Sequence, residues 1–255
     1  MMKIFVARGK TVAAVAAVLV LAIFFVALNF GNLLDVAASA SSRSLPIYRV
    51  RTDEKKVAIS FDAAWGNEDT QQLIDILNQY NVKATFFVVG SWVDKYPESV
   101  KALHDAGHDV MNHSNSHPHM SQLSAAQMVA EANACSDKIE KVTGTRPNLF
   151  RMPYGDYNTT VVDTLKQAGY YSIQWDVDSL DWKGLSAAEI AERVLSKTKS
   201  GSIVLFHNAA QNTPEALPKI IETLQGQGYE FVKIAELICK ENYAIDNTGE
   251  QYPLK

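Results

Sequence analysis

The sequence VAISFDAAWG, residues 57–66, begins with a short apolar run that ends at a carboxylate and a glycine-containing turn. Such a run, bounded by polar and turn residues, is typical of a buried strand. From about residue 69 the apolar side chains recur every three or four positions, which is the period of an amphipathic helix. The same order, a strand and then a helix, repeats along the chain. This alternation predicts a parallel sheet covered by helices.

Seven units of this kind can be assigned from residue 55 onward. The predicted strands cover residues 57–61, 84–89, 108–112, 148–151, 171–176, 203–207 and 229–232. The predicted helices cover residues 69–80, 97–106, 124–143, 158–168, 186–198, 214–227 and 233–240. Seven units favour a closed or nearly closed α/β barrel of about seven parallel strands, and a doubly wound open sheet is the alternative.

Two of these helices start with a capping box, in which a serine side chain and a Gln or Glu three residues later satisfy orphan backbone amides. The pairs are Ser124 with Gln127 and Ser186 with Glu189. Thr213 before Pro214 predicts a third helix start, with Thr213 as the capping residue.

The N-terminal segment has no charged residue between Lys10 and Asp35, a span of 24 residues. A hydrophobic helix of this length can cross the bilayer core of about 30 Å. The basic residues Lys3, Arg8 and Lys10 before it predict a cytoplasmic N-terminus. We therefore expect a single-pass protein of the cell membrane with an extracytoplasmic domain. The alternative is a signal peptide cleaved after Ala40, which would make the protein secreted.

Four parts follow from this pattern: residues 1–40 as an anchor or signal segment, 41–54 as a polar linker, 55–240 as the domain and 241–255 as a C-terminal tail.

After residue 40 the chain carries 21 basic and 27 acidic side chains. This acidic balance predicts no nucleic-acid partner. The two cysteines are too few for a disulfide scaffold. The sequence contains no G-x-S-x-G elbow, Walker loop or dinucleotide fingerprint, so we expect no serine nucleophile and no nucleotide cofactor.

Polar side chains gather at the carboxyl ends of five predicted strands. In barrels of this class the active site forms at that rim, because the strand ends converge there. The residues concerned are Asp62; Asn112, His113 and His117; Arg151 and Tyr154; Asp176, Asp178 and Asp181; and His207.

Asp62 follows an apolar strand, where a partly desolvated carboxylate must be paired or functional. It is a candidate general base, and a turn or helix-capping aspartate is the alternative. Arg151, next to Phe150, needs a carboxylate partner, for which Asp62 is the candidate. His207 ends a run of four apolar residues and is either a satisfied core histidine or, beside an aspartate, a general acid near neutral pH.

His113 and His117 are four residues apart and can contact one metal ion if the turn between them is helical. Pro118 limits any helix here, so a tight loop is also possible, and core histidines are the alternative to a metal site. A divalent metal would polarise a carbonyl group and its attacking water. Together with Asp62 and His207, the pattern indicates metal-assisted hydrolysis.

The segments FDAAWG, HSNSH, RMPYG, DSLDW and LFH, in this order, resemble the five motifs of polysaccharide deacetylases, the NodB-homology domain of carbohydrate esterase family 4. The resemblance covers residues 55–240. The AAWG variant behind an apolar segment is most similar to the PdaB-type sporulation deacetylases of spore-forming bacteria. The family implies a deformed (β/α) barrel and a divalent metal, usually zinc. It also implies removal of acetyl groups from N-acetylated sugars of cell-wall glycan such as peptidoglycan.

By position, the resemblance assigns Asp62 as the catalytic base and Arg151 as the residue that orients it. His113 and His117 match the two histidine metal ligands. His207 matches the general acid.

The remaining motif positions concern the substrate and the general acid. Tyr154 lies where a backbone amide serves the oxyanion, and Leu205 belongs to the last motif. Asp178 resembles the carboxylate that tunes the general acid, with Asp181 as the alternative. Trp182 would line the groove.

One position departs from the family pattern. The family has a second aspartate as metal ligand where this chain has Ala63, so the expected zinc site is incomplete. His119, Asn112, or Asp62 in a changed role could fill the gap. The leading hypothesis is a metal-dependent peptidoglycan N-deacetylase acting in sporulation. The alternative is a weakened or inactive glycan-binding protein of the same fold.

Overall fold

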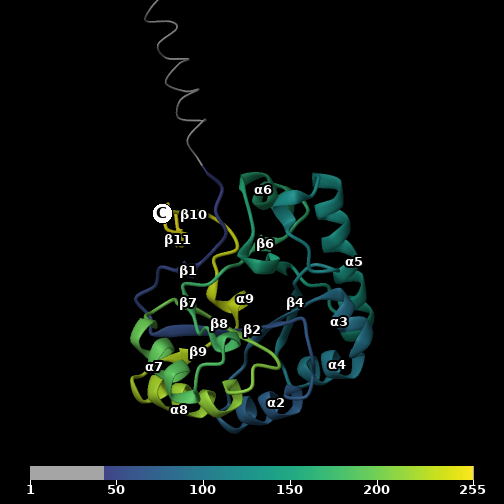
Figure 1. The fold of residues 1–255 in the computed structure, drawn as a ribbon. Helices are drawn as coiled ribbons and strands as arrows, with labels where there is room; N and C mark the ends of the chain where they lie inside the picture. Colours follow the sequence, from purple (N-terminus) through teal and green to yellow (C-terminus); the bar gives the residue numbers. More distant parts are fainter. Residues whose placement is uncertain (1–42, 255) are drawn as a thin grey trace, which may run out of the picture. The chain divides into compact units, whose positions relative to one another are not determined.

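In the computed structural model, which describes residues 43–254, seven parallel strands follow the order β6-β5-β4-β3-β2-β8-β7 (Figure 1). Their bounds are β2 Lys56–Ala63, β3 Thr85–Val88, β4 Asp109–Asn112, β5 Leu149–Phe150, β6 Tyr171–Ser172, β7 Val177–Asp178 and β8 Ile203–His207. A further short strand, β9 (Glu230–Phe231), pairs with the start of β2. Within these residues β6 and β7 are not paired with each other, so the sheet is a half-barrel. The predicted parallel α/β fold is confirmed, but the barrel is not closed.

Helices cover the outer side of the strands (Figure 1). They are α2 Thr70–Gln79, α3 Gly90–Lys95, α4 Pro97–Asp105, α5 Ala125–Thr143, α6 Thr159–Gln167, α7 Ala187–Lys197 and α8 Thr213–Gly226. Both predicted capping boxes are present, at Ser124 and at Ser186. The third start is shifted by one residue, because Asn212 is the capping position of α8 and Thr213 is already helical.

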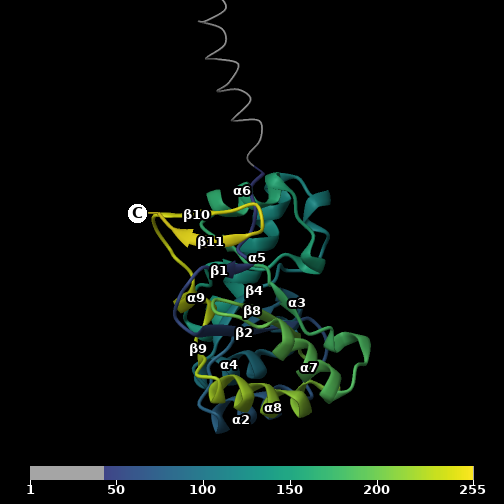
Figure 2. The same cartoon turned by 90° about the vertical axis from the view of Figure 1, so that its left-hand side faces the viewer.

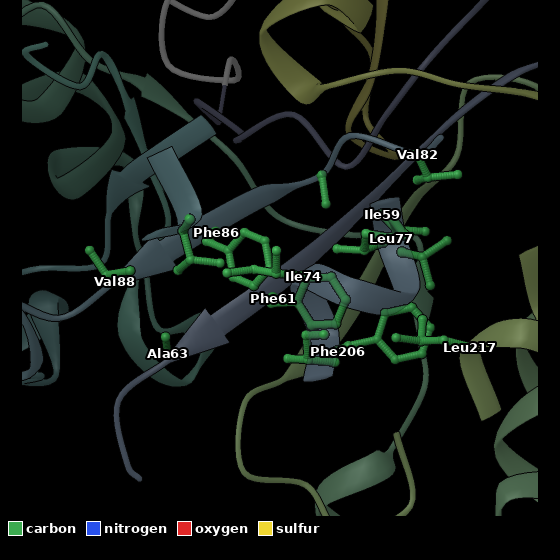
Figure 3. Packing of buried hydrophobic residues seen from close by; sticks show 14 of the residues in the cluster. Ile59, Phe61, Ala63, Ile74, Leu77, Val82, Phe86, Val88, Phe206 and Leu217 are labelled. Carbon is green, nitrogen blue, oxygen red and sulfur yellow. The ribbon is translucent and has the colours of Figure 1, made fainter. Parts of the chain in front are cut away.

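Side chains of β2 alternate between the two sides of the sheet, as an extended backbone requires. Val57, Ile59, Phe61 and Ala63 all belong to the apolar cluster that the outer helices share (Figure 3). The Phe61 ring stacks on those of Phe86 and Phe206, with ring centroids 4.7 and 5.5 Å away. Residues of the other parity therefore face the inner side. This parity turns Asp62 inward and turns Ala63 toward the helices.

The inner side of the half-barrel is filled by the two ends of the domain. Ile47 and Val50 pack there with helix α9 (Ile234–Leu237). The Ile47 amide donates to the Ser172 carbonyl at 2.8 Å, beside β6. The Val50 amide donates to the Gly201 carbonyl at 2.9 Å, just before β8. The segment before β2 thus spans the opening that the unpaired edge of β6 leaves.

A second, three-stranded sheet joins the N-terminal and C-terminal segments (Figure 2). It consists of β1 Arg49–Val50, β10 Tyr243–Ile245 and β11 Glu250–Pro253, in the order β1-β11-β10. The buried Gln251 side chain accepts a hydrogen bond from the Cys239 amide at 2.8 Å. Cys135 and Cys239 are free thiols. Residues of the predicted linker and tail therefore belong to the folded unit, which begins at Ser44.

The predicted strand 171–176 is wrong as one element. Only Tyr171 and Ser172 form β6, and after a crossing segment the chain forms β7 at the opposite end of the strand order. Asp176 also does not lie at the predicted rim. Its carboxylate accepts from the Ile203 amide and the Ser202 hydroxyl, at the start of β8.

The predicted hydrophobic helix within residues 1–40 lies outside the described residues. Among residues 43–254, no helix is both long enough and apolar enough to span a membrane.

Gly201 tests the contact between the N-terminal segment and the sheet. Its φ is +78°, and an added Cβ would lie 1.7 Å from the Val50 carbonyl oxygen. Gly144 has nearly the same φ, +73°, with open space around an added Cβ, so it is a matched control. We expect Gly144→Ala to cost about 1–2 kcal/mol for its left-handed backbone. Gly201→Ala should cost at least about 2 kcal/mol more, because the steric overlap adds to that cost. Urea unfolding measures both, and equal losses would contradict the role of Gly201 as the docking point of the N-terminal segment.

Candidate active site

The carboxyl ends of several strands surround one pocket with a cavity volume of about 410 Å³. Eight of the predicted site residues line it: Asp62, His113, His117, Tyr154, Asp178, Trp182, Leu205 and His207. Arg151 lies behind the wall, fully buried, and contacts Asp62. The structure thus brings the predicted residues together from five separate segments of the chain.

Asp62 and Arg151 form a buried ion pair. The Arg151 Nη1 donates to Asp62 Oδ1 at 2.8 Å, and its Nη2 donates to the Gln174 carbonyl at 3.2 Å. Burial alone would raise the pKa of Asp62, but the charged neighbours together, with Arg151 contributing most, outweigh burial and hold this pKa below its usual value. Asp62 is therefore ionised at neutral pH, as a general base must be.

His113 is held in one tautomer by the backbone of Arg151, at the end of the neighbouring strand β5. Its Nδ1 lies 2.8 Å from the Arg151 carbonyl oxygen, which can only accept, so Nδ1 carries the proton. The unprotonated Nε2 lies 3.6 Å from Asp62 Oδ2. Burial lowers the pKa of His113, although the charge of Asp62 opposes this effect. A neutral imidazole with a fixed free nitrogen is the form that binds metal ions.

His117 reaches the same pocket through a loop and not through a helix. Ser114 and His117 both have left-handed φ values, 68° and 61°, and the His117 amide donates to Ser114 Oγ at 3.0 Å. The His113 and His117 ring centroids are 5.0 Å apart. Burial, with a smaller contribution from His113, lowers the pKa of His117 to about 4. Both imidazoles are therefore neutral at pH 7.

The donor set fits two imidazole ligands but not a complete three-ligand zinc site. No group of three or more His, Cys, Asp and Glu side chains within residues 43–254 is placed to hold a metal ion. Ala63 lies on the helix-facing side of β2. Asn112 cannot fill the gap, because its amide is buried and bonded to Ala132, Ser136 and Ser114.

The two other candidates for a third ligand differ in position. His119 stacks on the Tyr154 ring, with centroids 4.4 Å apart, and its Nδ1 lies 3.7 Å from Asp156 Oδ2. It is exposed, outside the residues that line the pocket. Asp62 is the carboxylate beside His113. The structure therefore favours Asp62 over His119 as the third group that a cation bound by His113 and His117 would contact.

The aspartate that pairs with His207 is Asp181, so the assignment of this contact to Asp178 is wrong. His207 Nδ1 lies 2.7 Å from Asp181 Oδ1, and the His207 amide donates to Asp181 Oδ2 at 2.8 Å. Thr213 Oγ1 donates to the same carboxylate at 2.7 Å. Asp178 instead accepts from the Leu180 amide at 2.9 Å. Leu180 adopts a left-handed φ of 55° before the short helix Asp181–Lys183. This turn points the Asp181 carboxylate toward His207 at the end of β8.

Asp181 sets the proton affinity of His207. Burial alone would lower the pKa of His207, but the nearby carboxylates, chiefly Asp181 through its hydrogen bond and charge, together outweigh burial and raise this pKa above 6.5. Smaller contributions come from Asp62 and Asp178. The pocket thus holds an ionised carboxylate and a histidine that keeps its proton to a higher pH than an ordinary imidazole. Opposite shifts of this kind are typical of a base and an acid in one active site.

Three large aromatic side chains stand exposed around the pocket. The exposed fractions are 62% for Tyr154, 60% for Trp182 and 59% for Trp65. Trp65 was not predicted as a site residue, although it follows Asp62 by only three positions. Its ring lies 5.7 Å from that of His117, edge to face. Exposed aromatic side chains gathered at one pocket indicate a binding surface.

Replacing Asp181 should change the titration of His207. In Asp181→Asn the opposing effect of burial remains, so we expect the His207 pKa to fall below the ordinary value of 6.5. The imidazole would then lose its proton at lower pH than in the wild type. Asp178→Asn is the matched control, with a much smaller fall, because Asp178 contributes only a distant charge. The chemical shift of the His207 Cε1 proton, followed by NMR from pH 5 to 9, gives the His207 pKa in both variants. A larger fall of this pKa in Asp178→Asn than in Asp181→Asn would restore Asp178 as the partner.

Zinc affinity tests the imidazole pair. We expect His113→Ala and His117→Ala each to weaken zinc binding by at least about tenfold, since each removes a ligand. His119→Ala should leave the affinity nearly unchanged, because His119 packs on Tyr154 outside the pocket. Competition titration with a zinc-chelating dye gives the dissociation constants of the wild type and of the three variants. A loss in His119→Ala equal to that in His113→Ala would make His119 a ligand.

Comparison with known proteins identifies the family of the chain. The family model described as polysaccharide deacetylase matches residues 49–173. The peptidoglycan-N-acetylmuramic acid deacetylase PdaC of Bacillus subtilis is 36% identical over 188 residues, which are 74% of this chain and 40% of PdaC. Its counterpart PdaA from the same organism is 32% identical, with 78% of this chain and 77% of PdaA covered. The chain spans between 40% and 60% of the length of the first curated relatives that it matches.

A solved structure with the same fold is that of BA3943 from Bacillus anthracis, described as a CE4 family pseudoenzyme. It is 36% identical, with a TM-score of 0.73, and the alignment covers 76% of this chain and 68% of that chain. A mutant of BA3943 is described as having restored enzymatic activity. These comparisons do not test the PdaB-type subgroup, which stays a prediction. The shared motifs, the fold and relatives matched over most of their length lead to one conclusion: this chain belongs to the polysaccharide deacetylase family, carbohydrate esterase family 4.

Proposed function

We propose that this protein is a peptidoglycan N-deacetylase, a hydrolase that cleaves the amide bond of N-acetylated sugars. One observation carries the proposal. Asp62 and His207 line the same pocket, and their surroundings lower the pKa of Asp62 and raise that of His207, which suits the first to act as a base and the second as an acid.

The chemistry follows from these two groups. Asp62 takes a proton from water, and the water oxygen bonds to the carbonyl carbon of the acetamide. His207 gives its proton to the amide nitrogen as the carbon–nitrogen bond breaks. The products are acetate and a free sugar amine, and the proton on Asp62 balances the one that His207 has lost.

Two buried residues hold Asp62 and His207 in position. Arg151 fixes the direction of the Asp62 carboxylate, and Asp181 fixes the ring of His207. Tyr154 and Leu205 belong to the pocket wall that surrounds the acetyl group in this proposal. A divalent cation, zinc in the simplest case, would polarise the acetamide carbonyl when held by His113 and His117.

Peptidoglycan is proposed as the substrate for two reasons. The curated relatives PdaC and PdaA are peptidoglycan deacetylases by description. The exposed aromatic rings of Trp65, Tyr154 and Trp182 suit the apolar faces of sugar rings. We further propose, from the N-terminal sequence, that residues 1–40 export or anchor the domain outside the cytoplasm. A role in sporulation is proposed from the PdaB-type resemblance.

A second function has its own supporting observation. Ala63 replaces the acidic metal ligand of the family, and BA3943, described as a pseudoenzyme, has a similar fold. The alternative is therefore a protein that binds cell-wall glycan with little or no hydrolysis.

Acetate release distinguishes the two functions. Wild type, with added zinc, is incubated with N-acetylglucosamine oligomers and with purified peptidoglycan. We expect acetate from the wild type and losses of about 10²- to 10⁴-fold in Asp62→Asn and His207→Ala, because each removes a proton-transfer group. His104→Ala is the matched control, since His104 lies on α4 and lines no part of the pocket. A wild type that binds these glycans but releases no acetate from either substrate would rule out the hydrolase and support the alternative.

A further inference from the structure

Strand β10 (Tyr243–Ile245) is an edge of the small sheet, on the side of α6 in Figure 2. The Leu254 amide donates to the Asn242 carbonyl at 2.6 Å, so the backbone groups of Asn242 face β11. Backbone groups of an antiparallel strand alternate in direction, and those of Tyr243 and Ile245 therefore point away from β11. Within residues 43–254 no group bonds to these outward amides and carbonyls.

The outward edge offers two amides and two carbonyls at the spacing of an extended chain. Tyr243 and Ile245 are two residues apart, which in a strand is about 7 Å. A ligand that satisfies both residues must carry donors and acceptors at the same repeat. An extended peptide does so, because it can add to a sheet edge as a further strand.

A pocket with a cavity volume of about 360 Å³ opens at the start of β10. One wall comes from the end of α6 and the start of β6, and the other from residues 240–243. The Tyr171 hydroxyl donates to the Lys240 carbonyl at 2.9 Å and joins the two walls. The side chains that line the pocket include aromatic rings, one leucine that is 54% exposed and three charged groups: Tyr170, Tyr171, Tyr243, Leu254, Lys166, Lys240 and Glu241. Rings and a leucine suit an apolar side chain.

The charge of this pocket is opposite to that of the chain as a whole. Lys166 and Lys240 are exposed, and Glu241 is the one acid of the lining. Neither ammonium group forms an ion pair within residues 43–254, where the lysines that do are Lys56, Lys101, Lys138 and Lys233. After residue 40 the chain carries more acidic than basic side chains, 27 against 21. Two unpaired lysines beside an open strand therefore favour a partner that carries carboxylates.

We propose that β10 and this pocket form a docking surface for an extended acidic peptide segment of a partner protein. The segment adds to the small sheet beside β10 and bonds to the outward backbone groups of Tyr243 and Ile245. An apolar side chain enters the pocket, and carboxylates contact Lys166 and Lys240. No residue of this pocket lines the catalytic pocket, and β10 and β11 lie outside residues 49–173, which match the family model. The proposal is therefore independent of the hydrolase.

A short synthetic strand tests this docking surface. The probe is acetyl-Val-Glu-Val-Glu-Val-amide with a fluorescent label, titrated with the full-length chain in mild detergent and followed by anisotropy. We expect a dissociation constant on the order of 0.1 mM, since few backbone bonds and one pocket are available. The same peptide with Lys in place of Glu should bind at least about tenfold more weakly. A Glu peptide that is N-methylated at every residue should lose as much, because it has no amide donors.

Two measurements locate the bound peptide. Lys166→Gln with Lys240→Gln should weaken binding of the Glu peptide by about fivefold, because two exposed ion pairs are lost. Lys197→Gln is the matched control, since Lys197 is an exposed lysine at the end of α7 and does not line this pocket. Hydrogen exchange followed by NMR should show slower exchange of the Tyr243 and Ile245 amides when the peptide is bound. Thermal unfolding of each variant checks that the fold is kept.

Equal affinity for the Glu and Lys peptides, or undiminished binding after N-methylation, would overturn the proposal. Absence of binding at millimolar concentration would overturn it as well, as would unchanged exchange of the Tyr243 and Ile245 amides. A concentration-dependent dimer that already protects these two amides without peptide would assign the edge to a second copy of the chain. None of these readouts uses acetate release, so they do not depend on the outcome for the hydrolase.

Discussion

The buried contact between Arg151 and Asp62 is the interaction on which the site depends. The guanidinium is fully buried, lies over the Phe87 ring and bonds to Asp62 and to the Gln174 carbonyl, so one side chain ties β2, β3 and the segment after β6 to the end of β5. Its own backbone carbonyl fixes the tautomer of His113. Breaking such a pair by removing one partner typically costs about 3–5 kcal/mol, because the other charge stays buried. The same contact therefore contributes to the fold, the charge of the base and the direction of the nearest imidazole.

Much of this arrangement could be predicted from the sequence, because the signals are local. A run such as VAISF, a capping pair such as Ser186 with Glu189, and polar residues after strand ends are all short-range patterns. The choice between Asp178 and Asp181 is not local. It depends on the left-handed turn at Leu180 and on the approach of Thr213 from a different helix. Strands of two residues, such as β1 and β7, have no periodicity to detect, and their pairing partners lie far away in the chain.

Ala63 illustrates how strand parity limits what a single substitution can do. Asp62 faces the pocket and Ala63, the next residue, packs against the helix layer with Val88. A methyl group here suits the apolar cluster, whereas a carboxylate at the same position would have to turn out of that cluster to reach the imidazoles. Ala63 thus adds no polar group to the pocket, which Asp62, His207 and the exposed aromatic rings line.

The pairing of β1 with β11 also determines when the domain can be completed. Arg49 is opposite Glu250, so nearly the whole folded unit lies within the loop that this pair closes. Contacts of such large sequence separation form late, because the loop-closure entropy has to be overcome first. Until the last strand arrives, Ile47 and Val50 lack part of their support, and the inner side of the half-barrel stays open to water. During synthesis the chain would therefore acquire its outer helix layer early and its inner closure only after β11 has been made.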